Sequence, residues 1–454
     1  FRSFLKTTTY SKLTFEYHHM EEFRRGGDLL NRPPHEANVA EQTEHSINGG
    51  GLKFDYFSPN EKHRFNVFAS AQHINRDSYY GGGQDPNAYG NTTDLNWMAG
   101  SQYVYSFGKC IFMPADLTAG IEFNQDKLED NMWGYHRTVD QKVNIGSAFF
   151  QNEWKNEHWG FLIGGRLDKH NLIDHVIFSP RANLRYNPTE NINLRFSYSS
   201  GFRAPQAFDE DLHVENVGGN VAMVELADNL KEERSQSLSA SADIYHRFGA
   251  FQVNFLVEGF YTKLSDVFAL TDGEIVDGIL TRTRYNAPGA RVMGLTLEGK
   301  MAYLTKFQLQ AGITLQQSHY SEPHVWNPDA PAVKKMMRTP NTYGYFTATY
   351  TPIKPLSIAL SGTYTGSMLV PHEPVPGFLE KPITVNTKDF FDIGLKAAYD
   401  FKLYKSMNLQ VNAGVQNIFN AYQNDFDKGA DRDSGYIYGP SLPRSFFAGV
   451  KISY

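Results

Sequence analysis

The chain has 454 residues, a formal net charge of −6 and 14% aromatic residues, including 26 Tyr and 33 Phe. Its mean hydropathy is nevertheless polar, at −0.46. The acidic balance gives no basic surface for nucleic acid, and no apolar run is long enough for a transmembrane helix. A chain that is aromatic yet polar on average suits a barrel wall whose apolar side chains occupy every second position.

The dominant pattern along the chain is alternation with a period of two. In 193–198, Leu194, Phe196 and Tyr198 share one face, and Asn, Arg and Ser alternate with them. Such a polar face could not form a soluble sandwich core, so it predicts a wet lumen, and the apolar face predicts contact with lipid. The same alternation recurs in 251–258, 408–416 and 446–454.

This pattern predicts an all-β fold, a transmembrane antiparallel barrel that occupies the whole of residues 1–454. About 18 strands are expected if each needs roughly 10 residues to cross the membrane. We place them at 12–25, 46–57, 64–79, 94–107, 115–128, 142–156, 159–171, 177–187, 191–202, 234–248, 251–267, 286–304, 307–319, 341–351, 356–369, 390–403, 407–421 and 445–454.

The connections between the predicted strands alternate in length. Short ones carry Pro, Asn or Asp, as in 58–61, 187–190 and 351–355. Short turns on one side and long loops on the other are typical of outer-membrane barrels, with the long loops outside the cell. The long polar stretches are 26–45, 80–93, 129–141, 206–232, 266–288, 318–340, 370–389 and 424–443.

Four stretches in the second half of the chain carry a family resemblance. They read YSSGFRAP at 198–205 followed by DNLKEERS at 228–235, YNAPGA at 285–290, VQNIFNAY at 415–422, and GPSLPRSF at 439–446. In this order they resemble TonB-dependent outer-membrane receptors, and most of all those of Bacteroidota. The positions that match the family motifs include Phe202, Arg203, Ala204, Pro205, Asn229, Leu230, Asn417, Phe419 and the terminal aromatic Tyr454.

The resemblance implies a barrel of 22 strands, an N-terminal plug domain and coupling to the TonB complex through that plug. The chain starts inside what looks like barrel sequence, and we count about 18 strands. We therefore expect a barrel portion that lacks the plug and about four strands. Its expected location is the bacterial outer membrane, in contact with outer-membrane lipid.

The resemblance also implies import of a scarce solute, either a ferric siderophore, heme or cobalamin, with no resident cofactor. Glycan import with a surface lipoprotein partner is disfavoured because such barrels are usually much larger. His213 lies between the first two family motifs, where heme receptors of the family often carry a histidine. A neutral imidazole can ligate heme iron. The alternative, which the sequence favours, is an ordinary loop histidine flanked by acidic residues.

Aromatic and arginine side chains in the long loops are candidates for solute contact. Aromatic rings offer rigid contact area, and arginine pairs with catecholate or phosphate groups. The alternative for each is an interfacial or loop-packing role. The candidates are Arg24, Arg25, Tyr79, Tyr80, Tyr89, Trp133, Tyr135, Arg137, Tyr320 and Trp326.

Alternating carboxylates in the last long stretch could hold a divalent cation such as Ca²⁺. Asp425, Asp427 and Asp431 are the candidate ligands, since Ca²⁺ prefers carboxylate oxygens. The segment lacks the distal bidentate Glu of an EF-hand, and a solvated loop is the simpler interpretation.

The sequence has no H-E-x-x-H, G-x-S-x-G or P-loop motif, which disfavours an enzyme.

Two other functions, a passive porin and an adhesin, remain open for the barrel. A passive porin would give a large constant conductance, and an adhesin would bind a surface partner without uptake. An active importer instead requires a plug and a TonB-contacting segment in the complete gene.

Overall fold

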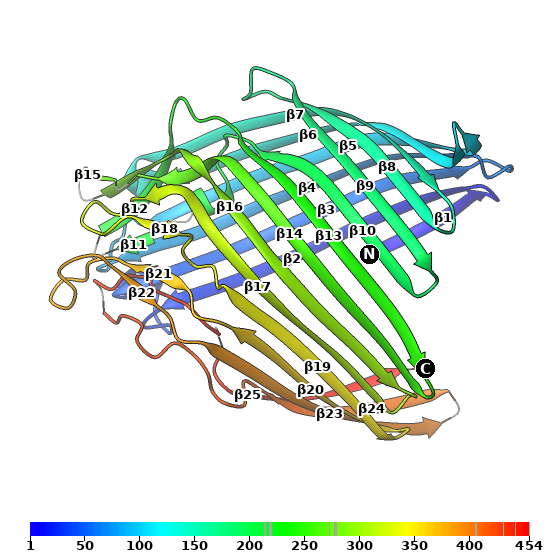
Figure 1. Ribbon diagram of the computed structural model, residues 1–454. Coiled ribbons are helices and arrows are strands. Elements are labelled where there is room, and N and C mark those ends of the chain that lie inside the picture. The colour runs from blue at the N-terminus through cyan, green and yellow to red at the C-terminus, as the bar shows by residue number, and fades with distance from the viewer. Residues whose placement is uncertain are drawn as a thin grey trace.

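The computed structural model describes residues 1–212, 215–217, 220–271, 273–276, 279–404, 406–429, 431–440 and 442–453. Its main feature is one large curved sheet, in which successive wall strands pair in antiparallel order (Figure 1). The wall strands are β1 (Arg2–Thr8), β2 (Ser11–Gly27), β3 (Val39–Phe57), β4 (His63–Gly82), β5 (Tyr89–Cys110), β6 (Met113–Met132), β7 (Arg137–Lys155), β8 (Trp159–His170), β9 (Ile177–Thr189), β10 (Ile192–Arg203), β13 (Glu233–Phe248), β14 (Phe251–Leu270), β16 (Ile279–Tyr303), β17 (Phe307–His324), β19 (Thr342–Ile353), β20 (Leu356–Thr365), β23 (Phe390–Tyr404), β24 (Met407–Gln416) and β25 (Ser445–Ser453).

Shorter elements lie in the connections between wall strands. None of the helices in the described part of the chain is long and apolar enough to cross a membrane. These elements are η1 (Pro34–Glu36), η2 (Trp133–Tyr135), α1 (Asp209–Leu212), β11 (Glu215–Val217), β12 (Asn220–Leu226), β15 (Glu274–Val276), β18 (Val333–Lys335), β21 (Leu369–His372) and β22 (Ile383–Asn386).

Each of the 18 predicted strands corresponds to a wall strand, which confirms the antiparallel all-β class. The structure adds β1, which the sequence analysis missed. Phe4 and Leu5 are adjacent in β1 and both largely exposed, so this strand carries no clean alternation. Among the described residues, β1 pairs with β2 alone and β25 with β24 alone, and the sheet therefore has two free edges.

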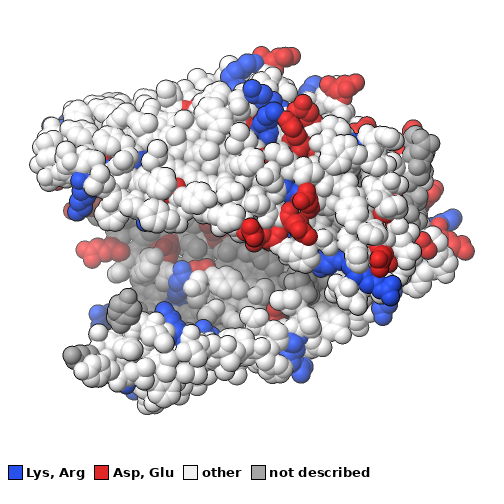
Figure 2. All heavy atoms as spheres, turned by 180° about the vertical axis from the view of Figure 1, so that it is seen from behind, with Lys and Arg blue, Asp and Glu red and all other residues white. Residues whose placement is uncertain are grey.

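The two faces of the wall differ as the alternation predicts. On β6, Ile121 is 62% exposed and points outward, whereas Glu122 and Asn124 point inward. An outward row runs across five strands, because each residue in it pairs with the next in the sheet register: Phe196, Ala240, Gly259, Leu295 and Leu315. From behind, the molecule is hollowed along its length, and broad stretches of the outer surface carry no charged side chains (Figure 2).

The two ends of the wall differ in their connections, as predicted. At the end that we call the turn end, short segments such as 249–250 and 304–306 join the strands. At the opposite end, which we call the loop end, long segments carry β11, β12, β15, β18, β21 and β22 (Figure 1, left).

Several strands extend further toward the loop end than predicted. Residues 39–45 were expected in a long polar stretch, but they pair with β4 as part of β3. Residues 129–132 and 137–141 likewise continue β6 and β7. In these extensions polar residues predominate, and the few apolar ones, such as Ala40 and Met132, do not form the alternation that marks the rest of each strand.

Residues 204–232 are called the inserted loop here, and those of them that the structure describes fold against the inside of the wall. Its strand β12 pairs in parallel with the start of β16, from Val221 opposite Ile279 to Leu226 opposite Arg284. The strands β11 and β12 also contact β4. The inserted loop therefore links two parts of the wall that are distant in sheet order.

Buried apolar clusters of the described residues lie among the loops at the loop end. One contains Tyr79 with Ala37, Ala40 and Ala88. A second contains Tyr80, Met132 and Met223, and a third contains Val370, Phe390, Tyr436 and Tyr438. The wall itself is a single sheet between lipid and a wet lumen, so its packing against other chain segments occurs where the loops cover it.

Candidate functional site

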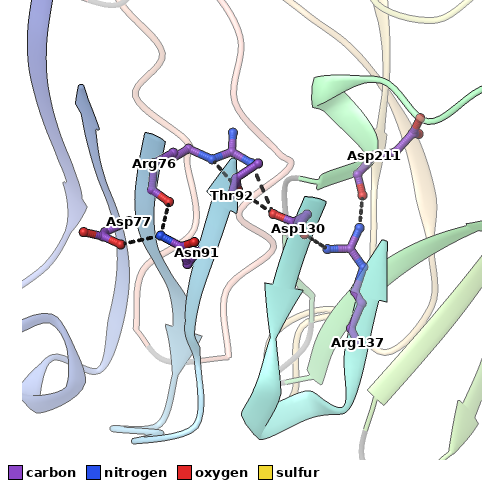
Figure 3. Close-up of polar contacts among 7 residues, drawn as sticks. All are labelled: Arg76, Asp77, Asn91, Thr92, Asp130, Arg137 and Asp211. Carbon is purple, nitrogen blue, oxygen red and sulfur yellow. Dashed lines mark hydrogen bonds and ion pairs between the residues drawn. The ribbon is translucent and has the colours of Figure 1, made fainter. Parts of the chain in front are cut away.

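A ladder of polar side chains crosses the inner face of β4, β5 and β6 near the loop end (Figure 3). The sheet register places Arg76 opposite Thr92, and Thr92 opposite Asp130. The Nε of Arg76 donates to the Thr92 hydroxyl at 3.0 Å, and that hydroxyl donates to Asp130 Oδ1 at 2.5 Å. All three side chains are buried, so these partners replace the water that each group would otherwise need.

The ladder continues from the wall into the inserted loop. Arg137 on β7 donates to Asp130 Oδ2 at 2.8 Å and to the backbone carbonyl of Asp211 at 2.8 Å (Figure 3). The carboxylate of Asp211 forms an ion pair with Arg284 on β16 and accepts the amide of Phe208 at 2.8 Å. Asp211 is 2% exposed. It therefore holds the inserted loop to β7 on one side and to β16 on the other.

A second polar pair lies on the outer face beside the ladder. Asn91 Nδ2 donates to Asp77 Oδ1 at 2.8 Å and to the backbone carbonyl of Arg76 at 3.4 Å (Figure 3). Charged and amide groups on both faces of β4 and β5 indicate that this part of the wall stands in water on both sides.

Four predicted tyrosines come together at the loop end. Tyr79 packs edge-on against Tyr89, with ring centroids 4.9 Å apart, and its hydroxyl donates to the backbone carbonyl of Asp85 at 2.9 Å. Tyr135 donates to Asp85 Oδ2 at 2.9 Å. Tyr79 is 1% exposed and Tyr80 6%, so both pack loops against the wall.

The predicted arginines of β2 have local partners. Arg24 pairs with Glu22 at 2.8 Å, and Arg25 donates to the backbone carbonyl of Asp28 at 3.4 Å. Arg137, in contrast, is tied to the inserted loop by a hydrogen bond.

The remaining predicted contact residues lie apart from the four tyrosines and the arginines described above. Trp133 is 64% exposed at the tip of the β6–β7 connection. The rings of Tyr320 and His324 lie at a tilt to each other, with centroids 4.8 Å apart. Trp326 lies in the connection between β17 and β19. His213 lies outside the described residues. The ligand roles of all these residues stay predictions.

The family-motif residues shape the connections. Arg203 lies 3.9 Å above the Phe208 ring, next to Phe202, and the buried Ala204 precedes Pro205 where the inserted loop begins. Asn286 holds the segment that contains Asn229 and Leu230, because its Oδ1 accepts the amide of Lys231 at 2.7 Å.

Asn417 is the motif residue with the most extensive contacts at the end of β24. Its φ is 48°, and its amide nitrogen donates to the carbonyls of Ala421 and Leu442, each at 2.9 Å. Its Oδ1 accepts the Ala421 amide at 2.8 Å. Phe419, two residues on, is exposed. Tyr454 lies outside the described residues.

The carboxylates predicted to bind a cation have protein partners. Asp425 accepts the hydroxyls of Tyr436 and Tyr438 at 3.0 and 2.6 Å. Asp427 pairs with His372 at 2.9 Å, and Asp431 is exposed. Within the described ranges, no group of three metal-ligating side chains is assembled, so the cation site stays a prediction without added support.

Asp425, Tyr436 and Tyr438 have shifted pKa values that a titration can check. Burial, together with the hydrogen bond to Asp425, raises the pKa of Tyr438 to about 12 and also raises the pKa of Tyr436. Burial acts to raise the pKa of Asp425 as well, but the bonds from Tyr438 and Tyr436 outweigh it and hold this pKa below its usual value. The tyrosines therefore contribute stability that is fully present below pH 10 and is lost as the pH rises through about 12.

We expect Asp425→Asn to move the pKa of Tyr438 from about 12 toward 10, because the negative charge beside the hydroxyl is removed. Tyrosinate absorbance during alkaline titration measures this change. Asp431→Asn is the matched control, since Asp431 is exposed in the same connection. Identical titration curves for the Asp425 variant and the wild type would contradict the assignment.

Sequence reasoning missed Arg76, Thr92, Asp130 and Arg284. The alternation places the first three on the inner face, but their partnership depends on the register between β4, β5 and β6. Arg284 meets Asp211 only because β12 joins β16 in parallel, a pairing that no local pattern indicates.

Comparison with known proteins gives one family and a set of structural relatives. The sequence model described as "TonB dependent receptor-like, beta-barrel" matches residues 4–418. No curated protein sequence matches the chain.

The structure is similar to the siderophore receptor PirA from Acinetobacter baumannii, at 12% identity and a TM-score of 0.70, covering 99% of this chain and 69% of that one. It is similar to the ferric enterobactin receptor of Pseudomonas aeruginosa, at 17% identity and a TM-score of 0.70, covering 98% and 67%. It is also similar to the ferric-catecholate import receptor Fiu of E. coli, at 14% identity and a TM-score of 0.67, covering 97% and 72%. At these identities the likeness is one of fold.

Proposed function

Because this chain belongs to the family of TonB-dependent receptor-like β-barrels, we propose that it forms the wall and mouth of a receptor that imports a ferric siderophore. The family places the barrel in the bacterial outer membrane, with the loop end outside the cell. The proposed partner that supplies energy is the TonB complex, acting through a plug domain.

The observation that carries this proposal is the inserted loop, which lies inside the extracellular mouth and is tied to both sides of the wall. Arg137 and Arg284 hold it through Asp211. A loop anchored in this way can present a shaped surface to a bulky solute.

The solute class is supported by the printed names of the structural relatives, which include receptors for siderophores and for ferric enterobactin. Heme and cobalamin are the other solutes that the family resemblance leaves open. Heme import would need an axial ligand such as His213, about which the structure gives no geometry.

Binding titrations of the full-length protein test the solute class. A ferric siderophore is expected to bind more tightly than heme or cobalamin, and uptake of radioactive iron in cells is expected to require an intact TonB complex. Tighter binding of heme or cobalamin would reassign the solute. Uptake that persists without TonB, together with a large constant conductance in planar bilayers, would replace the importer by a passive channel.

A further inference from the structure

A row of basic side chains crosses the outer face of the wall near the loop end. The register of the sheet places Lys263 on β14 opposite Arg291 on β16, and Arg291 opposite His319 on β17. Lys335 on β18 continues the row beside His319. Paired residues on antiparallel strands point to the same face, so these four side chains lie on one side of the sheet.

Two neighbouring cations of the row, Lys263 and Arg291, have no counter-charge among the residues that the structure describes. Lys263 and Arg291 are both exposed, and neither forms a hydrogen bond or ion pair with any residue that the structure describes. Like charges directly opposite each other on neighbouring strands destabilise a sheet. The arrangement therefore favours an external anion between the two side chains.

An apolar hollow of about 830 Å³ lies on the same face, next to the basic row and toward the turn end. Ala240 and Gly259 are paired at its floor. A side-chain carbon added at Gly259 would meet no atom within 4 Å, so the space above the floor is open. The walls of the hollow include Phe196, Leu238, Tyr261, Leu295 and Leu315.

The position of the hollow and the basic row along β14 sets their depth in the membrane. The outward residues of β14 are apolar or small from Phe251 to Gly259, then come Tyr261 and Lys263. An aromatic ring followed by a cation marks the boundary between hydrocarbon and headgroups. This boundary faces the loop end, so the hollow lies in the outer leaflet and the basic row lies at its headgroup level.

We propose that the basic row and the hollow form one binding site for a phosphorylated, acylated lipid of the outer leaflet. The phosphate lies between Lys263 and Arg291, and the acyl chains occupy the hollow above Gly259. Charge complementarity selects the headgroup, and the hollow is open on its outer side, so acyl chains can enter it from the bilayer. This site is on the lipid-facing surface and is independent of solute binding in the mouth.

Titration of the full-length protein in dodecyl maltoside with fluorescent monophosphoryl lipid A tests the site. The double variant Lys263→Gln, Arg291→Gln is expected to weaken binding at least tenfold. Gly259→Ile, which fills the hollow, is expected to weaken it at least threefold. Both changes point away from the lumen, and heat-modified migration on gels verifies that each variant is folded.

Two matched controls separate this site from the general membrane surface. Lys127→Gln removes an outward cation that is already paired with Glu129 at 2.5 Å. Gly299→Ile fills a glycine position that is equally open, in a lipid-facing hollow toward the turn end. Neither control is expected to change lipid affinity.

Unchanged affinity in the double variant or in Gly259→Ile would overturn the proposal. So would displacement of the lipid by millimolar inorganic phosphate, because that result identifies a simple anion site. Equally tight binding of dioleoyl phosphatidylcholine would also overturn it, since that lipid carries no net negative charge.

Discussion

Replacing Asp211 with alanine is expected to release the inserted loop and to weaken solute binding at least tenfold. The carboxylate is buried against Arg284, and its backbone carbonyl accepts a hydrogen bond from Arg137. Removing one partner of a buried ion pair costs about 3 kcal/mol or more, because the remaining charge is left without compensation. Hydrogen exchange of residues 204–232 measures the release, and binding titration measures its effect on the solute.

Asp228→Ala is the matched control for this prediction. Asp228 is a carboxylate in the same inserted loop, but it is exposed. It is expected to leave both exchange and affinity close to those of the wild type. If Asp211→Ala exchanged no faster than Asp228→Ala, the ladder would not be what holds the inserted loop.

The second large effect is expected at Asn417. Replacement by alanine removes three side-chain hydrogen bonds and leaves an alanine at a φ of 48°. Asparagine tolerates this left-handed conformation better than alanine does. With about 1 kcal/mol for each hydrogen bond, a total cost of about 3 kcal/mol is expected. Limited proteolysis should then cut the connection between β24 and β25 at a higher rate.

Asn424→Ala provides the comparison, because Asn424 is exposed in the same connection. Its cleavage rate is expected to match that of the wild type. Equal protection of residues 418–444 in the Asn417 variant would show that other contacts, such as the Tyr436 and Tyr438 cluster, are sufficient to hold this connection.

The wall could be predicted from sequence because lipid and water impose opposite demands on alternate residues. Leu194, Phe196 and Tyr198 illustrate this, and β10 lies where the alternation placed it. The physical signal weakens where the strands extend beyond the lipid. The extensions of β3, β6 and β7 were missed for this reason, and β1 was missed because Phe4 and Leu5 interrupt the alternation.

The candidate site was less accessible to prediction because it depends on long-range register. The structure brings Tyr79, Tyr80, Tyr89 and Tyr135 together near the loop end, but the burial of Tyr79 and Tyr80 against loops could not be read from the sequence. Asp211 was not among the predicted site residues. Its two arginine partners lie on β7 and β16, 74 and 73 residues away.

The strand extensions determine how far above the membrane surface the rim of the wall first contacts a solute. On β5, the outward apolar residues end at Leu95, yet the strand begins at Tyr89. Six further residues, tilted as barrel strands are, raise the rim by roughly 15 Å above the hydrocarbon. The mouth is therefore a rigid collar that projects beyond the lipid headgroups, and a solute can be captured without first approaching the membrane surface.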